Sequence, residues 1–529
     1  MLKVLAGAMA VVLSAGPAAA ADLAFATGAE QQAAIAGGQA TSKSLTEMYL
    51  DRIARIDRAG PTLNSVIALN PDALKTATRH DDERAAHHAH GPLHGLAILV
   101  KDNIETADPM ATTAGSLALK DNVAGRDAPL IARLRQAGVV ILGKTNLSEW
   151  ANFRSTRSIS GWSGIGGLVR NPYALDRSAC GSSSGSGAAV AAGLAWAAIG
   201  TETDGSVTCP AAMNGIVGLK PTVGLVSRTH IVPISASQDT AGPMARTVAD
   251  AAALLTAMAG SDPADPATAE ADAHRTDFLA GLDAGSLKGA RLGYVRSMTE
   301  RSPKTEAVFD KALETLKAAG AVLVEVKLPD ETPVDKAEDV VLHAEFKAGI
   351  DAYLASTAPD KVKTRTLDDL IAFNAATPRE TVLFGQEIFE EAAKAPALTD
   401  PAYKTALETG RRLAGPEGID KVLAEANVEA LVLPSGGPAS VVDPVNGSRW
   451  LGSPSTWPAV AGYPHLTVPM GYVSGLPVGL SFIGPKWSDG RLLSLGYAFE
   501  QAAPARLAPA FPPTVSGRPE YEAAYAPAP

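Results

Sequence analysis

The chain has 529 residues, 46% of them hydrophobic and 19% charged, and this composition excludes a wholly disordered protein. The formal net charge of -10 and the lack of any run of Lys and Arg argue against nucleic acid as a partner. Only two cysteines occur, Cys180 and Cys209, so burial of apolar side chains rather than a disulfide framework must hold the core together. This single pair is either bridged in an oxidising compartment or remains two small buried thiols.

The N-terminal segment, MLKVLAGAMAVVLSAGPAAAADLAF, is typical of an export signal. Lys3 supplies a positive charge, residues 4–13 an apolar stretch, and the alanines at 18–21 a cleavage site of small residues. About ten apolar residues are too few to cross a hydrocarbon core that needs about 20, which disfavours a membrane anchor. We therefore expect residues 1–21 to be removed, leaving a mature protein without membrane contact that is periplasmic or secreted.

Short apolar runs and helical periodicities alternate along the first third of the chain, which predicts an α/β layer structure. Ser44 and Glu47 have the spacing of a capping box, with Ser44 as the N-cap of a helix that ends at Gly60. The other elements expected here are strands at 65–69, 96–100 and 139–142 and a helix at 130–138.

The rest of the chain divides by composition. The run AAVAAGLAWAAIG (188–200) predicts a buried helix followed by a strand, whereas residues 262–425 are more charged and predict a helical elaboration on the sheet. Strand candidates return at 429–434, 466–470 and 478–484. Because strands lie on both sides of the helical segment, we expect one interleaved domain over residues 22–510. The Pro/Ala-rich tail at 511–529 is expected to wrap the surface or fray.

Two Gly/Ser-rich stretches, CGSSSGSGAAVAAG (180–193) and GTETDGSVTCP (200–210), raise the question of chemistry. A flexible linker should separate domains, but the first stretch runs directly into an apolar segment. A phosphate-binding loop would need a lysine after the glycines, and none follows. GSSSG (181–185) fits the nucleophile elbow of α/β-hydrolases, which also requires a downstream acid and histidine. Four downstream histidines are available, and the local sequence singles out none of them as catalytic: His230, His274, His343 and His465.

Four motifs in chain order resemble those of the amidase signature family. They are GLAILVKDNI (95–104), CGSSSGSGAAVAAG (180–193), GTETDGSVTCPAAMNGIVGLKPT (200–222) and GLPVGLSFIG (475–484). The resemblance covers residues 40–503, and the wording TETDGS…CPA looks most like bacterial peptide amidases. It implies a single large α/β domain with a central mixed, twisted sheet flanked by helices, and hydrolysis of a carboxamide without any metal or cofactor.

The resemblance also implies a Ser–cisSer–Lys triad. By motif position, Ser206 is the nucleophile, Ser182 the bridging serine that follows a cis peptide bond, and Lys101 the base. The side chains of Thr203 and Asp204 are expected to brace the turn before the nucleophile. The backbone N–H groups implied as the oxyanion hole belong to Thr203, Asp204, Gly205 and Ser206.

The residue types suit this chemistry. An alcohol is a poor nucleophile at neutral pH, so a base must take its proton during attack. Lys101 can do so only if desolvation lowers its pKa from about 10.4, and the end of a buried strand is a suitable place for this. On the strand pattern alone a lysine that extends its amine to solvent is the favoured alternative, and it is the motif context that favours the base. Asp102 would oppose that shift if it pointed inward. Ser182 can relay the proton because a hydroxyl both donates and accepts hydrogen bonds.

The positions after the nucleophile bear on the substrate. Several relatives have an arginine two or three residues after it, and in some this arginine meets a substrate carboxylate. Here the positions hold Val207, Thr208 and Cys209, which favours a neutral or peptide carboxamide. The predicted substrate is the C-terminal amide of peptides, with aliphatic, aryl or oligomeric amides as the alternative. A protein like the amidase-type subunit of glutamyl-tRNA amidotransferase and a non-catalytic binding protein on the same scaffold are less favoured.

Three further features of the sequence carry weaker signals. If Ser182 and Ser206 touch, Cys180 and Cys209 lie close enough for a bridge to be possible. Trp150, Phe153, Trp162 and Tyr173 belong either to the core or to a substrate cleft. The histidines of RHDDERAAHHAHGPLHG (79–95) are expected on a solvated face rather than in a metal site, and they are His80, His87, His88, His90 and His94.

Overall fold

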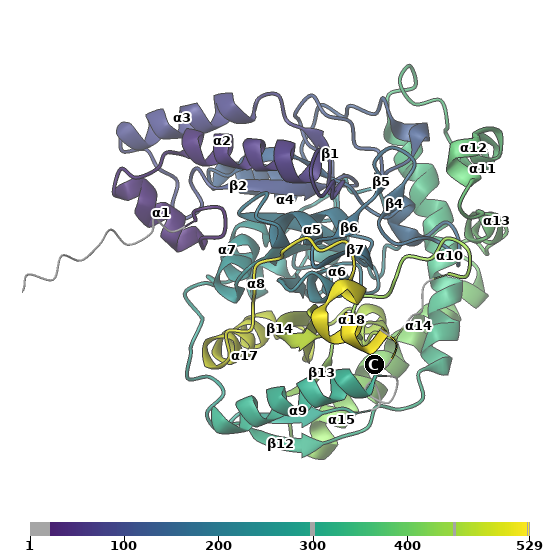
Figure 1. The fold of residues 1–529 in the computed structure, drawn as a ribbon. Coiled ribbons are helices and arrows are strands. Elements are labelled where there is room, and N and C mark those ends of the chain that lie inside the picture. Colours follow the sequence, from purple (N-terminus) through teal and green to yellow (C-terminus); the bar gives the residue numbers. More distant parts are fainter. Residues whose placement is uncertain (1–21, 297–301, 448–450, 526, 528–529) are drawn as a thin grey trace, which may run out of the picture.

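One large mixed sheet runs through the centre of the molecule, and helices flank it (Figure 1). The computed structural model describes residues 22–296, 302–447, 451–525 and 527, so the predicted export signal at 1–21 lies outside the described residues. The predicted fold class, a single α/β domain with a central mixed sheet, is confirmed. Within the described residues the sheet has 11 strands.

The strand order across the sheet differs from the order along the chain. From one edge to the other the strands are β1 (Val66–Leu69), β3 (Val140–Thr145), β2 (Ala97–Lys101), β8 (Ala197–Glu202), β10 (Thr240–Ala245), β9 (Val217–Lys220), β14 (His465–Val473), β15 (Leu476–Ile483), β13 (Ala430–Pro434), β11 (Arg291–Tyr294) and β12 (Val322–Glu325). The strand β2 is parallel to both of its neighbours, β3 and β8. Because parallel strands end at the same edge of a sheet, the residues after β2 and β8 are brought together.

Two small hairpins lie outside this sheet. They pair β4 (Trp162–Ser163) with β5 (Gly167–Leu168), and β6 (Arg170–Asn171) with β7 (Ala174–Ser178).

The helices are distributed over the length of the chain. Those of the first half are α1 (Gly28–Ala36), α2 (Ser42–Arg52), α3 (Ala73–Ala85), α4 (Pro129–Gln136), α5 (Ser184–Ala191), α6 (Thr208–Met213), α7 (Val248–Met258) and α8 (Ala271–His274). Those of the second half are α9 (Pro303–Ala318), α10 (Thr332–Ser356), α11 (Leu367–Ala376), α12 (Pro378–Thr381), α13 (Glu387–Ala392), α14 (Pro401–Ala414), α15 (Asp420–Ala426), α16 (Thr456–Ala461), α17 (Asp489–Ala502) and α18 (Pro519–Tyr525).

Alternating side chains of β14 show which helices cover which face. Thr467 points toward α6, whereas Leu466 and Val468 meet Gly496 of α17 on the opposite face. The helix α5 packs beside α6, while α7 and α9 both contact α17. Helices therefore cover both faces of the sheet, which buries the continuous apolar strands β2, β8 and β13 completely.

Two local predictions need correction. The helix α2 begins after Thr41, which is its N-cap, and Ser44 occupies the third position of a Thr41–Ser44 capping box. Both side chains can accept the backbone hydrogen bonds, so local spacing alone could not choose between them. The segment 262–425 is not only helical, because it also supplies β11 and β12, two parallel strands at one edge of the sheet.

The tail after residue 510 wraps the surface rather than fraying. Phe511 donates a backbone hydrogen bond to Pro172, and Pro512 accepts one from Leu175. Val515 is buried against the main core, and α18 follows.

The predicted solvated face of histidines is correct for three members and wrong for two. His87, His88 and His90 are exposed, but His80 and His94 are 3% and 0% exposed. His80 turns inward because it lies on the buried side of α3, and His94 lies in the connection that enters β2.

Candidate active site

The site lies at the sheet edge where β2 and β8 end. Lys101 is the last residue of β2 and is fully buried. Its Nζ lies 2.7 Å from Ser182 Oγ, 2.8 Å from Thr201 Oγ1 and 3.1 Å from the Thr201 carbonyl oxygen. The buried amine therefore has a polar partner in each of three directions, which fixes its position.

The two predicted serines lie on neighbouring segments. Ser182 follows a cis Gly181–Ser182 peptide bond in the loop before α5, as the family resemblance implied. Ser206 lies in the loop between β8 and α6, and its carbonyl oxygen accepts a 3.1 Å hydrogen bond from the N–H of Ser183. Within the described part of the chain, no hydrogen bond joins the Ser182 and Ser206 hydroxyls. The structure thus joins Lys101 directly to Ser182 and places the Ser206 segment alongside.

Burial controls the protonation of Lys101. Desolvation lowers its pKa to about 7, while the carboxylates of Asp239 and Glu202 act in the opposite direction. Asp102 faces another lysine, because its Oδ1 lies 3.7 Å from the buried Nζ of Lys144. The carboxylate of Asp102, the residue that follows Lys101, therefore pairs with Lys144 and not with Lys101.

The turn before Ser206 is braced by its side chains, as predicted. Thr203 Oγ1 donates a 2.5 Å hydrogen bond to Asp239, and Thr456 Oγ1 donates a 3.0 Å bond to Asp204 Oδ2. Gly205 has a φ of +78°, and a Cβ at this position would lie 2.8 Å from Ser455 Oγ. The turn therefore needs glycine for both backbone conformation and space.

Sequence reasoning missed Thr201 and Glu202. Thr201 gives Lys101 two of its three partners. Glu202 Oε2 accepts hydrogen bonds from the N–H groups of Val207 at 2.7 Å and Thr208 at 2.9 Å. A buried carboxylate thus holds the first residues of α6, directly after the nucleophile candidate. The one available signal was a Thr–Glu pair that ends an otherwise apolar strand.

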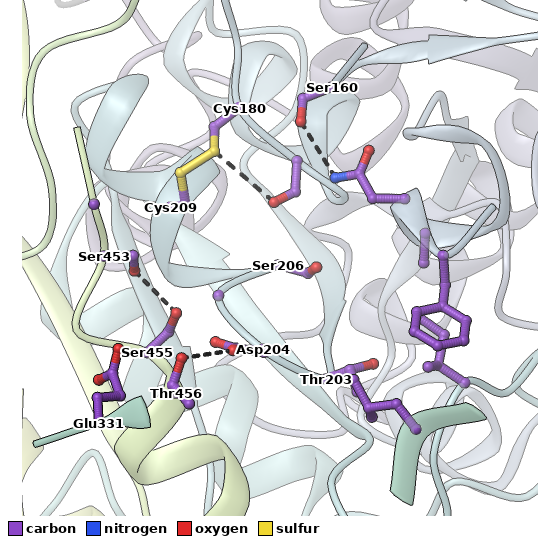
Figure 2. A pocket seen from close by; sticks show the side chains of 18 residues that line it. Ser160, Cys180, Thr203, Asp204, Ser206, Cys209, Glu331, Ser453, Ser455 and Thr456 are labelled. Carbon is purple, nitrogen blue, oxygen red and sulfur yellow. Dashed lines mark hydrogen bonds between the residues drawn. A yellow bond between two sulfur atoms is a disulfide. The ribbon is translucent and has the colours of Figure 1, made fainter. Parts of the chain in front are cut away.

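A cavity of about 440 Å³ opens beside Ser206 (Figure 2). Gly181 and the turn Thr203–Ser206 form one side, and Glu331, Ser455 and Thr456 contribute from the C-terminal half of the chain. Ser206 is 7% exposed, so access to it is through this cavity.

The cavity wall contains few ionisable or aromatic side chains. Among its described lining residues there is no Lys, Arg or His, and the ionisable side chains are Asp204 and Glu331. In the α/β-hydrolase pattern GSSSG the nucleophile would be Ser183, which is fully buried and whose Oγ donates to the Thr201 carbonyl at 3.1 Å and accepts from the Thr201 N–H at 3.2 Å, so its hydroxyl bonds to the backbone and not to a histidine. Of the four aromatic residues in question, Phe153 lines the cavity, whereas Trp150, Trp162 and Tyr173 are buried elsewhere.

Cys180 and Cys209 form a disulfide, which settles the open question of the two cysteines. The bridge spans 29 positions in sequence and also borders the cavity (Figure 2). It connects the loop that contains Ser182 to the helix that follows Ser206.

The family model described as Amidase matches residues 44–493. The chain belongs to the amidase family. Its motifs and its sheet therefore have the same origin as those of known amide-hydrolysing enzymes, and this amidase is an enzyme of that type. The matched segment lies within the predicted domain of residues 22–510 and includes every residue implied for the triad.

Solved structures show the same fold in peptide amidases. The amidase has 52% identity to the native peptide amidase from Stenotrophomonas maltophilia, with a TM-score of 0.88 over 93% of this chain and 99% of that one. A peptide amidase in complex with the competitive inhibitor chymostatin matches at 53% identity and a TM-score of 0.88, covering 92% of this chain and 99% of that one.

The chain is also similar to a probable amidase and to a subunit of an amidotransferase. A probable amidase from Arabidopsis thaliana is 40% identical over 89% of this chain and 88% of its own. A glutamyl-tRNA(Gln) amidotransferase subunit from Acidothermus cellulolyticus is 35% identical over 91% of this chain and 95% of its own.

Proposed function

We propose that this amidase hydrolyses the C-terminal carboxamide of peptides to a carboxylate and ammonia through an acyl-enzyme on Ser206. The supporting observation is the 2.7 Å contact between Lys101 Nζ and Ser182 Oγ, next to a cavity that exposes Ser206. In this proposal Lys101 is the base, Ser182 the relay and Ser206 the nucleophile.

The proton moves in two linked transfers during attack. As a neutral amine, Lys101 has two N–H donors and one lone pair, so it donates to Thr201 and accepts the Ser182 proton. Ser182 in turn takes the proton of Ser206 as Ser206 Oγ bonds to the amide carbon. Separations at nucleophile–base pairs are often looser without substrate, so the Ser182–Ser206 link is expected to close when the amide binds. The ammonium form of Lys101 then returns the proton through Ser182 to the amide nitrogen, which leaves as ammonia when the C–N bond breaks. Water next attacks the acyl-enzyme with its proton taken along the same path, and this releases the carboxylate and restores Ser206.

The charge that develops on the amide oxygen needs donors placed in advance. The backbone N–H groups of Thr203, Asp204, Gly205 and Ser206 are proposed for this role, because the braced turn holds them at the cavity. A fixed turn loses no free energy to reorganisation when the charge appears.

The side chains that line the cavity favour a substrate that carries no charge next to the bond that is cleaved. A substrate carboxylate beside the scissile bond would find no cationic side chain among the described lining residues and would meet Asp204 and Glu331. A carboxamide carries no charge and avoids this repulsion. The similarity to peptide amidases at more than half identity supports a peptide as the remainder of the substrate.

The first 21 residues support a periplasmic or secreted location for the enzyme, as does a disulfide at the site. No helix in the described part of the chain has the length and apolar character needed to cross a membrane.

The direct test compares a peptide amide with the matching free acid. Purified mature enzyme should release ammonia from the amide and none from the acid, and a coupled ammonia assay measures both. A panel of aliphatic and aryl amides, run at equal concentration, separates the peptide substrate from the broader alternative. If no amide yields ammonia, a binding function on the same scaffold replaces the proposal.

A second comparison addresses the amidotransferase alternative. Free glutamine presents a carboxylate that the cavity does not neutralise, so kcat/KM for glutamine should lie far below that for a peptide amide. Equal values for the two substrates would favour the amidotransferase role. The export signal and the net charge of -10 already argue against a tRNA-linked role.

A further inference from the structure

Three imidazoles surround one carboxylate on the side of the molecule occupied by α3 (Figure 1). Glu83 Oε2 lies 2.8 Å from His80 Nδ1, 3.7 Å from His90 Nε2 and 3.8 Å from His94 Nε2. None of these side chains lines the cavity at Ser206. The cluster is therefore separate from the amidase chemistry.

We propose that His80, Glu83, His90 and His94 form a binding site for a divalent transition-metal ion, with Zn²⁺ as the best match. The donor set of imidazole nitrogen and carboxylate oxygen is the set that Zn²⁺ accepts in tetrahedral sites. Nothing in the proposed amide hydrolysis depends on this ion.

The geometry suits a tetrahedral ion after small side-chain movements. Zinc bonds of about 2.0–2.1 Å place tetrahedral ligand atoms about 3.3–3.4 Å apart. The three distances from Glu83 Oε2 lie on either side of that value, at 2.8, 3.7 and 3.8 Å. His80, Glu83 and His94 also form a group in which all ligand atoms lie within 4.8 Å of one another.

The side chains of the cluster are already oriented toward one another. His94 is fully buried, and its Nε2 lies 3.8 Å from Glu83 Oε2. The 2.8 Å contact between His80 Nδ1 and Glu83 Oε2 shows that the carboxylate already faces the rings. Arg79 approaches the other oxygen of Glu83, at 3.5 Å, which leaves Oε2 for the ion.

An ion that binds to the cluster must displace one hydrogen bond, and it can enter from solvent past one exposed side chain. His94 Nε2 contacts the carbonyl oxygen of His80 at 2.9 Å, and this hydrogen bond must be exchanged for the metal bond. His90 is 49% exposed, so it provides both a ligand and an entry path from solvent. The bound ion would tie α3 to the loop that leads into β2.

The test uses mature enzyme without an affinity tag, stripped of metal with a chelator and titrated with ZnCl₂ in a calorimeter. We expect one Zn²⁺ per chain and a rise in the melting temperature that EDTA reverses. Co²⁺ at the same site should give the visible absorption of a tetrahedral complex with nitrogen and oxygen ligands.

The variants isolate the ligands from the rest of the segment. His90→Ala and Glu83→Gln should each weaken Zn²⁺ binding by at least about tenfold. His88→Ala, an exposed histidine of the same loop outside the cluster, should bind like the unmodified chain. His90→Ala removes a half-exposed side chain, so the test holds even if Glu83→Gln folds poorly. No Zn²⁺ binding, or equal affinity in the His88→Ala and His90→Ala variants, overturns the proposal.

Discussion

Lys101 illustrates how the surroundings of one side chain change its protonation. On its own, a lysine at a strand end is cationic at neutral pH. Here full burial lowers its pKa to about 7, and Thr201 supplies two acceptors that hold the amine next to Ser182. The same environment that favours the neutral form therefore also positions it.

The pH dependence of the enzyme should report this lysine. Below a pKa of about 7 the amine is protonated and cannot accept the Ser182 proton, so kcat/KM should rise with pH through that value and then level off. A pH–rate profile on a peptide amide measures it. A rate that stays constant from about pH 6 to pH 8 would contradict a titrating base in this range.

Removing the proposed nucleophile and base should separate chemistry from folding. Ser206→Ala should lower kcat by about 10⁴-fold or more, and Lys101→Ala by about 10³-fold, with the melting temperature of Ser206→Ala unchanged. Ser453→Ala, which alters another serine of the cavity wall, is the matched control and should retain most activity. Near-normal activity of Lys101→Ala at neutral pH would show that another group is the base.

Gly205 tests the turn independently of the side chains. Gly205→Ala places a methyl group 2.8 Å from Ser455 Oγ at a φ of +78°, so the turn must shift and its N–H groups with it. We expect a loss of about 10²-fold in kcat, the effect typical of one displaced oxyanion donor. Gly447→Ala has a similar φ of +80° with no atom of the described residues within 4 Å of its added methyl group, and its kcat should not change. Equal kcat in the two variants would remove the turn from the mechanism.

At the scale of elements, the site depends on two loops that meet. The loop before α5 contains Ser182, and the loop from β8 to α6 contains Ser206. Glu202 holds the second loop to the end of its own strand, and the Cys180–Cys209 disulfide connects it to the first. Both attachments use groups that lie within a few residues of the serines.

The disulfide should stabilise the fold as a whole. A cross-link over 29 positions lowers the conformational entropy of the unfolded chain. On the loop-entropy model this raises the free energy of unfolding by about 3–4 kcal/mol. The double variant Cys180→Ser, Cys209→Ser should therefore melt at a lower temperature than the oxidised enzyme, and dithiothreitol should lower the melting temperature of the native chain in the same way. If reduction leaves the melting temperature unchanged, the bridge is not formed in the purified enzyme.

At the scale of the whole molecule, the sheet order brings together residues that are far apart in sequence. Lys101 and Thr201 are 100 positions apart, yet they lie on adjacent parallel strands. The segment 262–425 adds strands to one edge of the sheet, and its α10 begins beside Glu331 at the cavity.

Export is a prediction about the whole chain as well. Expressed in a bacterial host with its own first residues, the enzyme should be recovered outside the cytoplasm with a mature N-terminus near Ala21 or Asp22. N-terminal sequencing or intact mass measures this position. A purified chain that still begins at Met1 would contradict export.

Most elements could be predicted, because their signals are local. The strands at 65–69, 429–434 and 478–484 were found to within about two residues from their apolar runs. The edge strand β12 and its neighbour β11 were missed since short strands inside a charged, helical segment carry little local signal.

The sequence by itself determined the family, the fold class and the positions of Lys101, Ser182 and Ser206, because motifs and apolar periodicity are properties of neighbouring residues. Only the tertiary structure decided the depth of burial, the closed disulfide, the pairing of Asp102 with Lys144 and the inward turn of His80 and His94. These depend on which distant segments pack together. Desolvation and hydrogen bonding act through space, so no spacing along the chain specifies them.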